Sequence, residues 1–167
     1  LRADLPRIRY AVVGAVIDGY EVQSMAAEMG LDDIVRFVGY ADDDIFADYL
    51  HAVDIGINLR HPTTGETSAA LLSMMAAGKP CLVSNTDAFA ELPDDACIKI
   101  ATDVNELPQV VAWLSRLAQE TELRQRMGGS AHDYVERECA PSVVAQQNLD
   151  FMQSISERVQ QQNRWPV

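Results

Sequence analysis

A single carboxylate stands where a polar loop meets an apolar segment, in the stretch HPTTGETSAALLSMMAAGKP at residues 61–80. Glu66 is the only acid in this stretch, and Pro62 and Gly65 precede it. A carboxylate at such a junction can accept hydrogen bonds from the hydroxyl groups of a ligand. It can also act as no more than a favourable negative charge at the N-terminus of a helix. The residue types alone favour the second interpretation, because no Walker lysine and no GxGxxG motif accompany the acid.

The residues that follow this carboxylate could hold a phosphate group. Their spacing predicts a helix over 67–77, whose first amides lack intrahelical partners and carry partial positive charge. These amides are those of Thr67, Ser68 and Ala69. Amides at a helix N-terminus bind phosphates, and Gly65 allows the backbone to approach a ligand closely. A diphosphate could therefore bind without net positive charge, which fits the formal net charge of −12.

Strands and helices alternate along the first two thirds of the chain. Short apolar runs predict strands at 8–14, 33–39, 54–59, 80–84 and 96–100. Helical spacing predicts helices at 19–30, 42–53 and 67–77, then almost continuously from 104, with the last one after Pro141. Such alternation implies right-handed βαβ units and an α/β fold with a doubly wound parallel sheet. Ligands bind beyond the C-terminal ends of the strands in these sheets, and the loop with Glu66 lies there.

Length and composition limit the other possibilities. The 167 residues suffice for one domain spanning 1–167. No uncharged apolar run reaches the ~18 residues of a transmembrane segment. The strongly negative net charge argues against nucleic acid as a partner. The three cysteines and three histidines follow no metal-ligating pattern, so we expect no metal, no cofactor and a cytoplasmic location with reduced thiols.

The run ETSAALLSMMAAGKPCLVS, from Glu66 to Ser84, resembles the donor-site signature of glycosyltransferase family 4, whose members are retaining enzymes with a GT-B fold. That signature is a Glu, seven residues, a second position, and then roughly Ala-Met-Ala-x-Gly-x-Pro. Glu66 matches its first Glu, and Glu91 resembles a later Glu of the family. The matches at its end are Met75, Ala76, Gly78, Lys79 and Pro80. The flanking segments 31–58 and 131–145 also match, so the resemblance covers about residues 8–155.

The resemblance implies a Rossmann-like domain that forms the C-terminal half of a GT-B fold and binds a nucleotide-diphosphate sugar. The enzyme would transfer a hexose-type sugar to a glycan or lipid-linked acceptor in polysaccharide biosynthesis. Glu66 would be the catalytic-site acid that accepts hydrogen bonds from hydroxyls of the donor sugar, and the amides after it would hold the distal phosphate. Gly39 and Tyr40 would line the nucleobase pocket. The leaving diphosphate would help to remove the acceptor's proton, so neither a protein nucleophile nor a metal is required.

The chain departs from the family at its second glutamate, which usually binds the ribose hydroxyls. Ser73 stands there, seven positions after Glu66, and a hydroxyl is a weaker, uncharged acceptor. A degenerate, non-catalytic binding module is therefore an alternative to the enzyme. We favour the enzyme because Glu66 and the turn at 78–80 are present. An oxidoreductase of Rossmann type lacks its glycine fingerprint here.

The family's domain opens with a strand and carries an Arg and a Lys that neutralise the diphosphate, and a separate N-terminal domain binds the acceptor. None of these precedes LRADLPRIRY. We therefore expect a fragment of a cytoplasmic or membrane-peripheral protein, with an unpaired sheet edge and no sugar transfer by this chain alone. Arg60, at a predicted strand end, is expected either to pair with a phosphate or to form a salt bridge with an acid such as Glu91.

Overall fold

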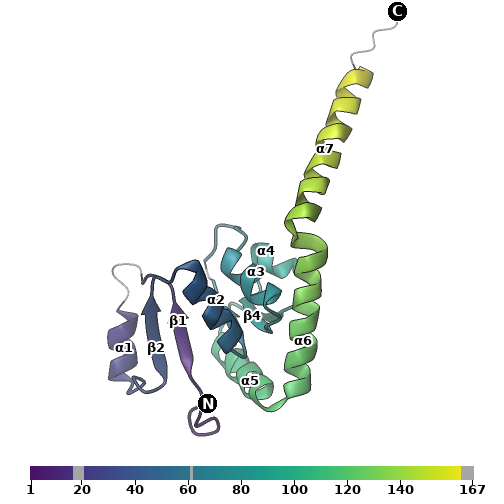
Figure 1. The fold of residues 1–167 in the computed structure, drawn as a ribbon. Coiled ribbons are helices and arrows are strands. Elements are labelled where there is room, and N and C mark those ends of the chain that lie inside the picture. Colours follow the sequence, from purple (N-terminus) through teal and green to yellow (C-terminus); the bar gives the residue numbers. More distant parts are fainter. Residues whose placement is uncertain (17–20, 61, 163–167) are drawn as a thin grey trace, which may run out of the picture.

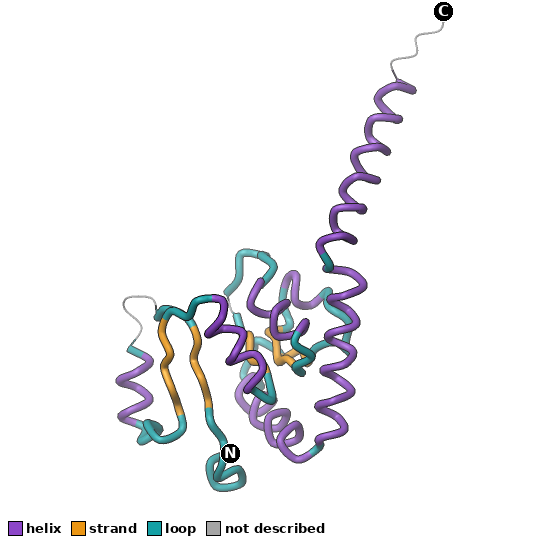
Figure 2. Tube along the Cα trace, viewed as in Figure 1, coloured by secondary structure: helices purple, strands orange, loops and turns teal. Residues whose placement is uncertain are grey.

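The computed structural model describes residues 1–16, 21–60 and 62–162, with side chains to residue 159. Residues 19 and 20, at the start of the helix expected at 19–30, therefore lie outside the described part. Figure 1 shows a small α/β body from which the last helix projects, and Figure 2 separates its strands from its helices.

All five predicted strands are present, and every pairing between them is parallel. The strands are β1 (Tyr10–Val13), β2 (Val35–Gly39), β3 (Gly56–Asn58), β4 (Cys81–Ser84) and β5 (Ile98–Ile100). They form two sheets, β1-β2 and β3-β4-β5, where one continuous sheet is predicted. The prediction of a single sheet is therefore wrong for the described residues, in which no ladder of backbone hydrogen bonds joins β1 to β3. β1 and β3 each have one partner among the described residues and are therefore edge strands.

The helices follow the predicted order, with α4 as an addition. They are α1 (Val22–Glu28), α2 (Asp43–Ala52), α3 (Ala69–Ala76), α4 (Asp87–Ala90), α5 (Glu106–Gln119), α6 (Thr121–Tyr134), the π-helical turn η1 (Val135–Cys139) and α7 (Pro141–Gln162). Asp42 caps α2, as its position suggests, by accepting a hydrogen bond from the amide of Ile45 at 2.9 Å. Gly30 follows α1 with φ +64°, the conformation of a helix-terminating glycine. The sequence does not predict α4, and it predicts an ordinary helix where the π-helical turn η1 lies.

The core surrounds β4, whose four residues are all buried. On one face of its sheet, Leu71 and Met75 of α3 pack with residues of α4, the end of α6 and η1. On the other face, Leu117 of α5 packs with residues of the first half of α6. A parallel strand that is covered on both faces is mostly apolar, as Cys81–Val83 are, and the buried hydroxyl of Ser84 at its end is hydrogen-bonded. This arrangement fixes the C-terminal ends of β3 and β4, from which the loop with Glu66 emerges.

The last helix, α7, extends away from this body (Figure 1). Its exposed apolar side chains are Val144, Leu149, Phe151, Met152, Ile155 and Val159. Within the described residues, no helix is both long enough and apolar enough to cross a membrane.

Candidate functional site

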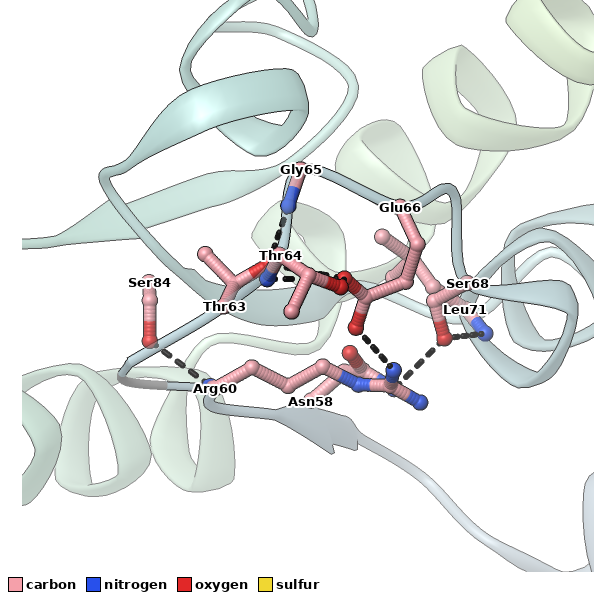
Figure 3. A network of polar contacts seen from close by, with 9 residues as sticks. All are labelled: Asn58, Arg60, Thr63, Thr64, Gly65, Glu66, Ser68, Leu71 and Ser84. Carbon is pink, nitrogen blue, oxygen red and sulfur yellow. Dashed lines mark hydrogen bonds and ion pairs between the residues drawn. The ribbon is translucent and has the colours of Figure 1, made fainter.

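The loop between β3 and α3 is attached to the buried end of the neighbouring strand. The amide of Arg60 donates a hydrogen bond to Oγ of Ser84 at 2.8 Å, and Ser84, at the C-terminal end of β4, is only 1% exposed. The loop therefore begins from a fixed point at the C-terminal edge of the sheet, where the sequence places Glu66. Figure 3 shows this attachment and the polar contacts that follow it.

The other end of the loop is fixed by the N-cap of α3. Ser68 is 2% exposed, and its Oγ accepts hydrogen bonds from the amide of Leu71 at 3.2 Å and from Nδ2 of Asn58 at 3.1 Å. The predicted helix start at residue 67 is therefore wrong, because Ser68 caps a helix that begins at Ala69. Thr67 and Ser68 precede the first turn.

The amides that could hold an anion consequently shift along the chain. The first amides inside α3 are those of Ala69 and Ala70, whereas the amide of Leu71 is taken by the cap. Among the described residues, neither of these two amides donates a hydrogen bond to another protein group. They point out of a helix N-terminus, where the helix dipole favours negative charge.

The Glu66 carboxylate is held by donors of its own loop (Figure 3). Its Oε1 accepts a hydrogen bond from Nη1 of Arg60 at 3.0 Å. Its Oε2 accepts from Oγ1 of Thr63 at 3.1 Å, and from the amide and Oγ1 of Thr64 at 3.0 and 2.6 Å. Hydrogen bonds to the ionised form, foremost that from the Thr64 hydroxyl, lower the pKa of Glu66 to about 2. Sequence reasoning missed both threonines, although hydroxyls two and three residues before a carboxylate are a usable signal.

This network predicts an unusually acidic titration. Above pH 4.5 the ionised carboxylate should keep the loop fully hydrogen-bonded, and its stabilising effect should decline only as the pH falls toward about 2. The amide proton of Thr64 reports the change directly, so we expect its NMR chemical shift to stay constant from pH 7 to pH 4 and then to move. The substitution Glu66→Gln should abolish that movement. A midpoint above pH 4 in the wild type would contradict the hydrogen bonding described above.

Arg60 forms a salt bridge, which is one of the two alternatives expected from the sequence, but its partner is Glu66. Its guanidinium pairs with Glu66 at 3.0 Å, with 39% and 43% of the two side chains exposed, and not with Glu91. In the part of the chain that the structure describes, the guanidinium donates no other hydrogen bond. It therefore keeps most of its five N–H donors for another group.

Three of the predicted site residues meet in one cavity. Thr67, Ser68 and Glu91 line a space of about 200 Å³ beside the N-terminus of α3. Glu91 reaches it because α4, which the sequence does not predict, ends there. Residues of α3, α4, α6 and η1 complete the wall: Leu71, Leu72, Ala88, Phe89, Leu92, Tyr134 and Cys139.

Three other predicted residues lie apart from the loop. Ser73 is half-buried, and its hydroxyl donates to the carbonyl of Ala69 at 3.0 Å within α3. Six residues separate it from Glu66, one fewer than in the signature that it resembles. Gly39, with φ +76°, is the last residue of β2 in the other sheet, and Tyr40 follows it and is 85% exposed. No hydrogen bond among the described residues links these two to the loop.

A family model described as "Glycosyl transferases group 1" matches residues 1–119, which include both sheets, the loop and α3. The chain belongs to this glycosyltransferase family. No curated protein sequence matches the chain. Family membership agrees with the resemblance noted in the sequence, at the level of a GT-B glycosyltransferase.

Solved structures share the fold of this glycosyltransferase domain. HepE of Anabaena, crystallised with UDP, superposes with a TM-score of 0.74 at 18% identity, over 89% of this chain and 42% of its own. Sucrose-phosphate synthase of Thermosynechococcus elongatus gives 0.67 at 19%, over 93% and 41%. The C-terminal domain of the glycosyl transferase LpcC of Francisella tularensis gives 0.60 at 17%, over 78% and 87%. The chain spans less than half the length of the first two. These likenesses confirm the expected fold, a Rossmann-like domain of the kind that forms the C-terminal half of GT-B enzymes.

Proposed function

We propose that the chain is the donor-binding domain of a retaining family 4 glycosyltransferase, which transfers a hexose-type sugar from a nucleoside diphosphate to a glycan or lipid-linked acceptor. The observation that carries the proposal is the loop at the C-terminal edge of β3 and β4. It is fixed at both ends, and it leads from Arg60, which pairs with Glu66, to the unengaged first amides of α3. Among proteins with this fold, HepE of Anabaena was crystallised with UDP and with UDP-glucose.

The diphosphate binds at the amides of Ala69 and Ala70, with Arg60 as the accompanying cation. Gly65 has φ +84°, and a Cβ added to it would meet no atom within 4 Å, so the backbone can approach the ligand there. Glu66 accepts one hydroxyl of the donor sugar at Oε1, because the loop already saturates Oε2. Such a site accelerates transfer by positioning and electrostatics rather than by a protein nucleophile.

The remaining assignments follow the family resemblance. Gly39 and Tyr40 line the nucleobase pocket, and Glu91 lies beside the sugar in the cavity that it shares with Thr67. Oγ of Ser73 accepts a hydrogen bond from a ribose hydroxyl, because the hydroxyl proton of Ser73 is already donated to the carbonyl of Ala69. The acceptor substrate binds mainly to the N-terminal domain typical of such enzymes. No metal or cofactor takes part.

A non-catalytic binding module is the second candidate, and the serine at position 73 is the observation that favours it. Calorimetric titration of the chain with UDP, GDP, ADP and their glucose or mannose conjugates tests the feature that both candidates share. We expect one nucleoside diphosphate to bind with a clear preference over the others. The absence of binding by all of them would contradict both candidates.

The full-length protein then separates the two. Incubation with the preferred nucleotide sugar and a panel of glycan and lipid-linked acceptors should yield a product whose anomeric configuration, read by NMR, equals that of the donor. An inverted product would exclude the retaining mechanism. Tight donor binding without release of the nucleotide would favour the binding module.

A further inference from the structure

The backbone of Arg60 cannot move independently of the sheet. Its amide is bonded to Ser84, which lies at the end of the fully buried β4 and is itself 1% exposed. The starting point of the side chain is therefore fixed with respect to α3, which packs on the same strand in one core cluster.

The far end of the Arg60 side chain is fixed as well, and Glu66 is what fixes it. Oε2 of Glu66 receives three hydrogen bonds from Thr63 and Thr64, which leave Oε1 directed at the guanidinium (Figure 3). One oxygen of the carboxylate is thus held by the loop while the other holds Arg60. An exposed arginine otherwise samples many rotamers, so this contact restricts that freedom before any ligand arrives.

We infer that Glu66 is a positioning residue that orients the Arg60 guanidinium toward a diphosphate at the N-terminus of α3. The inference rests on the proposed function, because it assumes that the first amides of α3 receive that diphosphate. The guanidinium donates one hydrogen bond to Glu66, and its remaining N–H groups have a planar arrangement that suits phosphate oxygens. Orienting such a fork in advance strengthens binding of the phosphates themselves, whether or not a sugar is attached.

An opposing effect makes the inference testable by sign. A carboxylate next to an anion site repels the anion, so loss of its charge would tighten diphosphate binding if repulsion dominated. If orientation dominates, loss of the carboxylate weakens binding even though the site becomes more positive. The geometry favours orientation, because all four hydrogen bonds of the carboxylate come from the loop and from Arg60.

The test is calorimetric titration of the chain with UDP, GDP and ADP, and with the glucose conjugate of whichever binds. Arg60→Gln and Glu66→Gln should each weaken the best nucleoside diphosphate by about fivefold to tenfold, the effect of losing one charge-assisted contact. The double variant should bind the diphosphate no more weakly than the weaker-binding single variant, because both substitutions disrupt the same Arg60–Glu66 pair. The sugar conjugate should lose at least as much affinity.

The chain offers a matched control on α5. Arg116 and Glu120 form a salt bridge at 2.8 Å with 50% and 48% of their side chains exposed, close to the values of the Arg60–Glu66 pair. Arg116→Gln and Glu120→Gln remove the same charges on α5, outside the loop, so they measure how far a change of net charge alters nucleotide affinity. We expect neither to change nucleotide affinity by more than about twofold at 0.15 M salt.

The outcomes separate this inference from the proposed function. Weaker binding of the sugar conjugate with unchanged binding of the diphosphate in Glu66→Gln would overturn the inference and leave the proposed function standing. Tighter diphosphate binding in that variant, or additive losses in the double variant, would overturn it as well. Failure of the wild type to bind any of the three diphosphates would overturn the proposed function and, with it, the role of Arg60 toward a phosphate.

Discussion

Replacement of Gly128 by alanine is expected to lower the free energy of unfolding by about 3 kcal/mol, the upper range for overpacking. A Cβ at this position would overlap the carbonyl oxygen of Gly78 and lie 2.9 Å from its carbonyl carbon. Both atoms belong to the backbone, so no side-chain rotation relieves the overlap. Gly78 itself has φ +68° in the turn between α3 and β4, which restricts its own movement. Helix α6 would have to move away from that turn.

The neighbouring glycine is a matched control for this substitution. Gly129 lies in the same helix, and a Cβ there would have no atom within 4 Å. Alanine is favoured over glycine inside a helix by about 0.5–1 kcal/mol, so Gly129→Ala should stabilise the protein by that amount. Urea unfolding of both variants, followed by circular dichroism, measures the difference. Similar changes in the two variants would show that α6 does not approach the turn as closely as described.

This contact illustrates what the sequence leaves undetermined. The pair Gly128–Gly129 lies within a run with helical spacing, and local pattern cannot tell which glycine is needed for packing. The answer depends on the turn at Gly78, 50 residues earlier, which meets α6 only in the folded chain. Sequence reasoning therefore predicts α6 correctly but not its crossing of α3.

The strands were predictable for the opposite reason. Each lies in a short, largely apolar run bounded by turn residues, and such a run is itself a local signal for a strand. The division of the strands into two separate sheets was harder to predict, because a sequence pattern predicts a strand but not which strands lie beside it. Helix α4, at four residues, is too short to show a helical period and was missed, whereas η1 lies in a run predicted to be an ordinary helix.

The candidate site divides along the same line. The position of its loop, the glycine before Glu66 and the helix behind it follow from local sequence. The start of α3 is set by the N-cap Ser68, a local signal that the predicted range 67–77 does not use, whereas the hydrogen bond from Asn58 that ties this cap to β3 joins residues ten positions apart. The partner of Arg60 also depends on the conformation of the loop. The only sequence signal for this conformation is the pair of threonines that donate hydrogen bonds to Glu66.

Ser68→Ala is expected to cost about 2–3 kcal/mol of unfolding free energy, the sum of a lost N-cap and of a buried amide left without its partner. Oγ of Ser68 accepts hydrogen bonds from the Leu71 amide and from Asn58, and alanine can accept neither. Within the described residues, Oδ1 of Asn58 is already buried without a hydrogen-bond partner. The substitution would leave both polar atoms of that side chain unsatisfied.

Ser73→Ala is the control, because it removes a hydroxyl from the same helix. The Ser73 hydroxyl donates to the carbonyl of Ala69, which already belongs to the helix, so its loss should cost less than about 0.5 kcal/mol. The double variant Ser68→Ala, Asn58→Ala then separates the two terms: removal of the stranded amide should recover part of the loss, whereas the cap remains absent. Urea unfolding of the three variants measures each step. If Ser68→Ala cost no more than Ser73→Ala, the N-terminus of α3 would not be held by this cap, and its first amides would not be fixed for an anion.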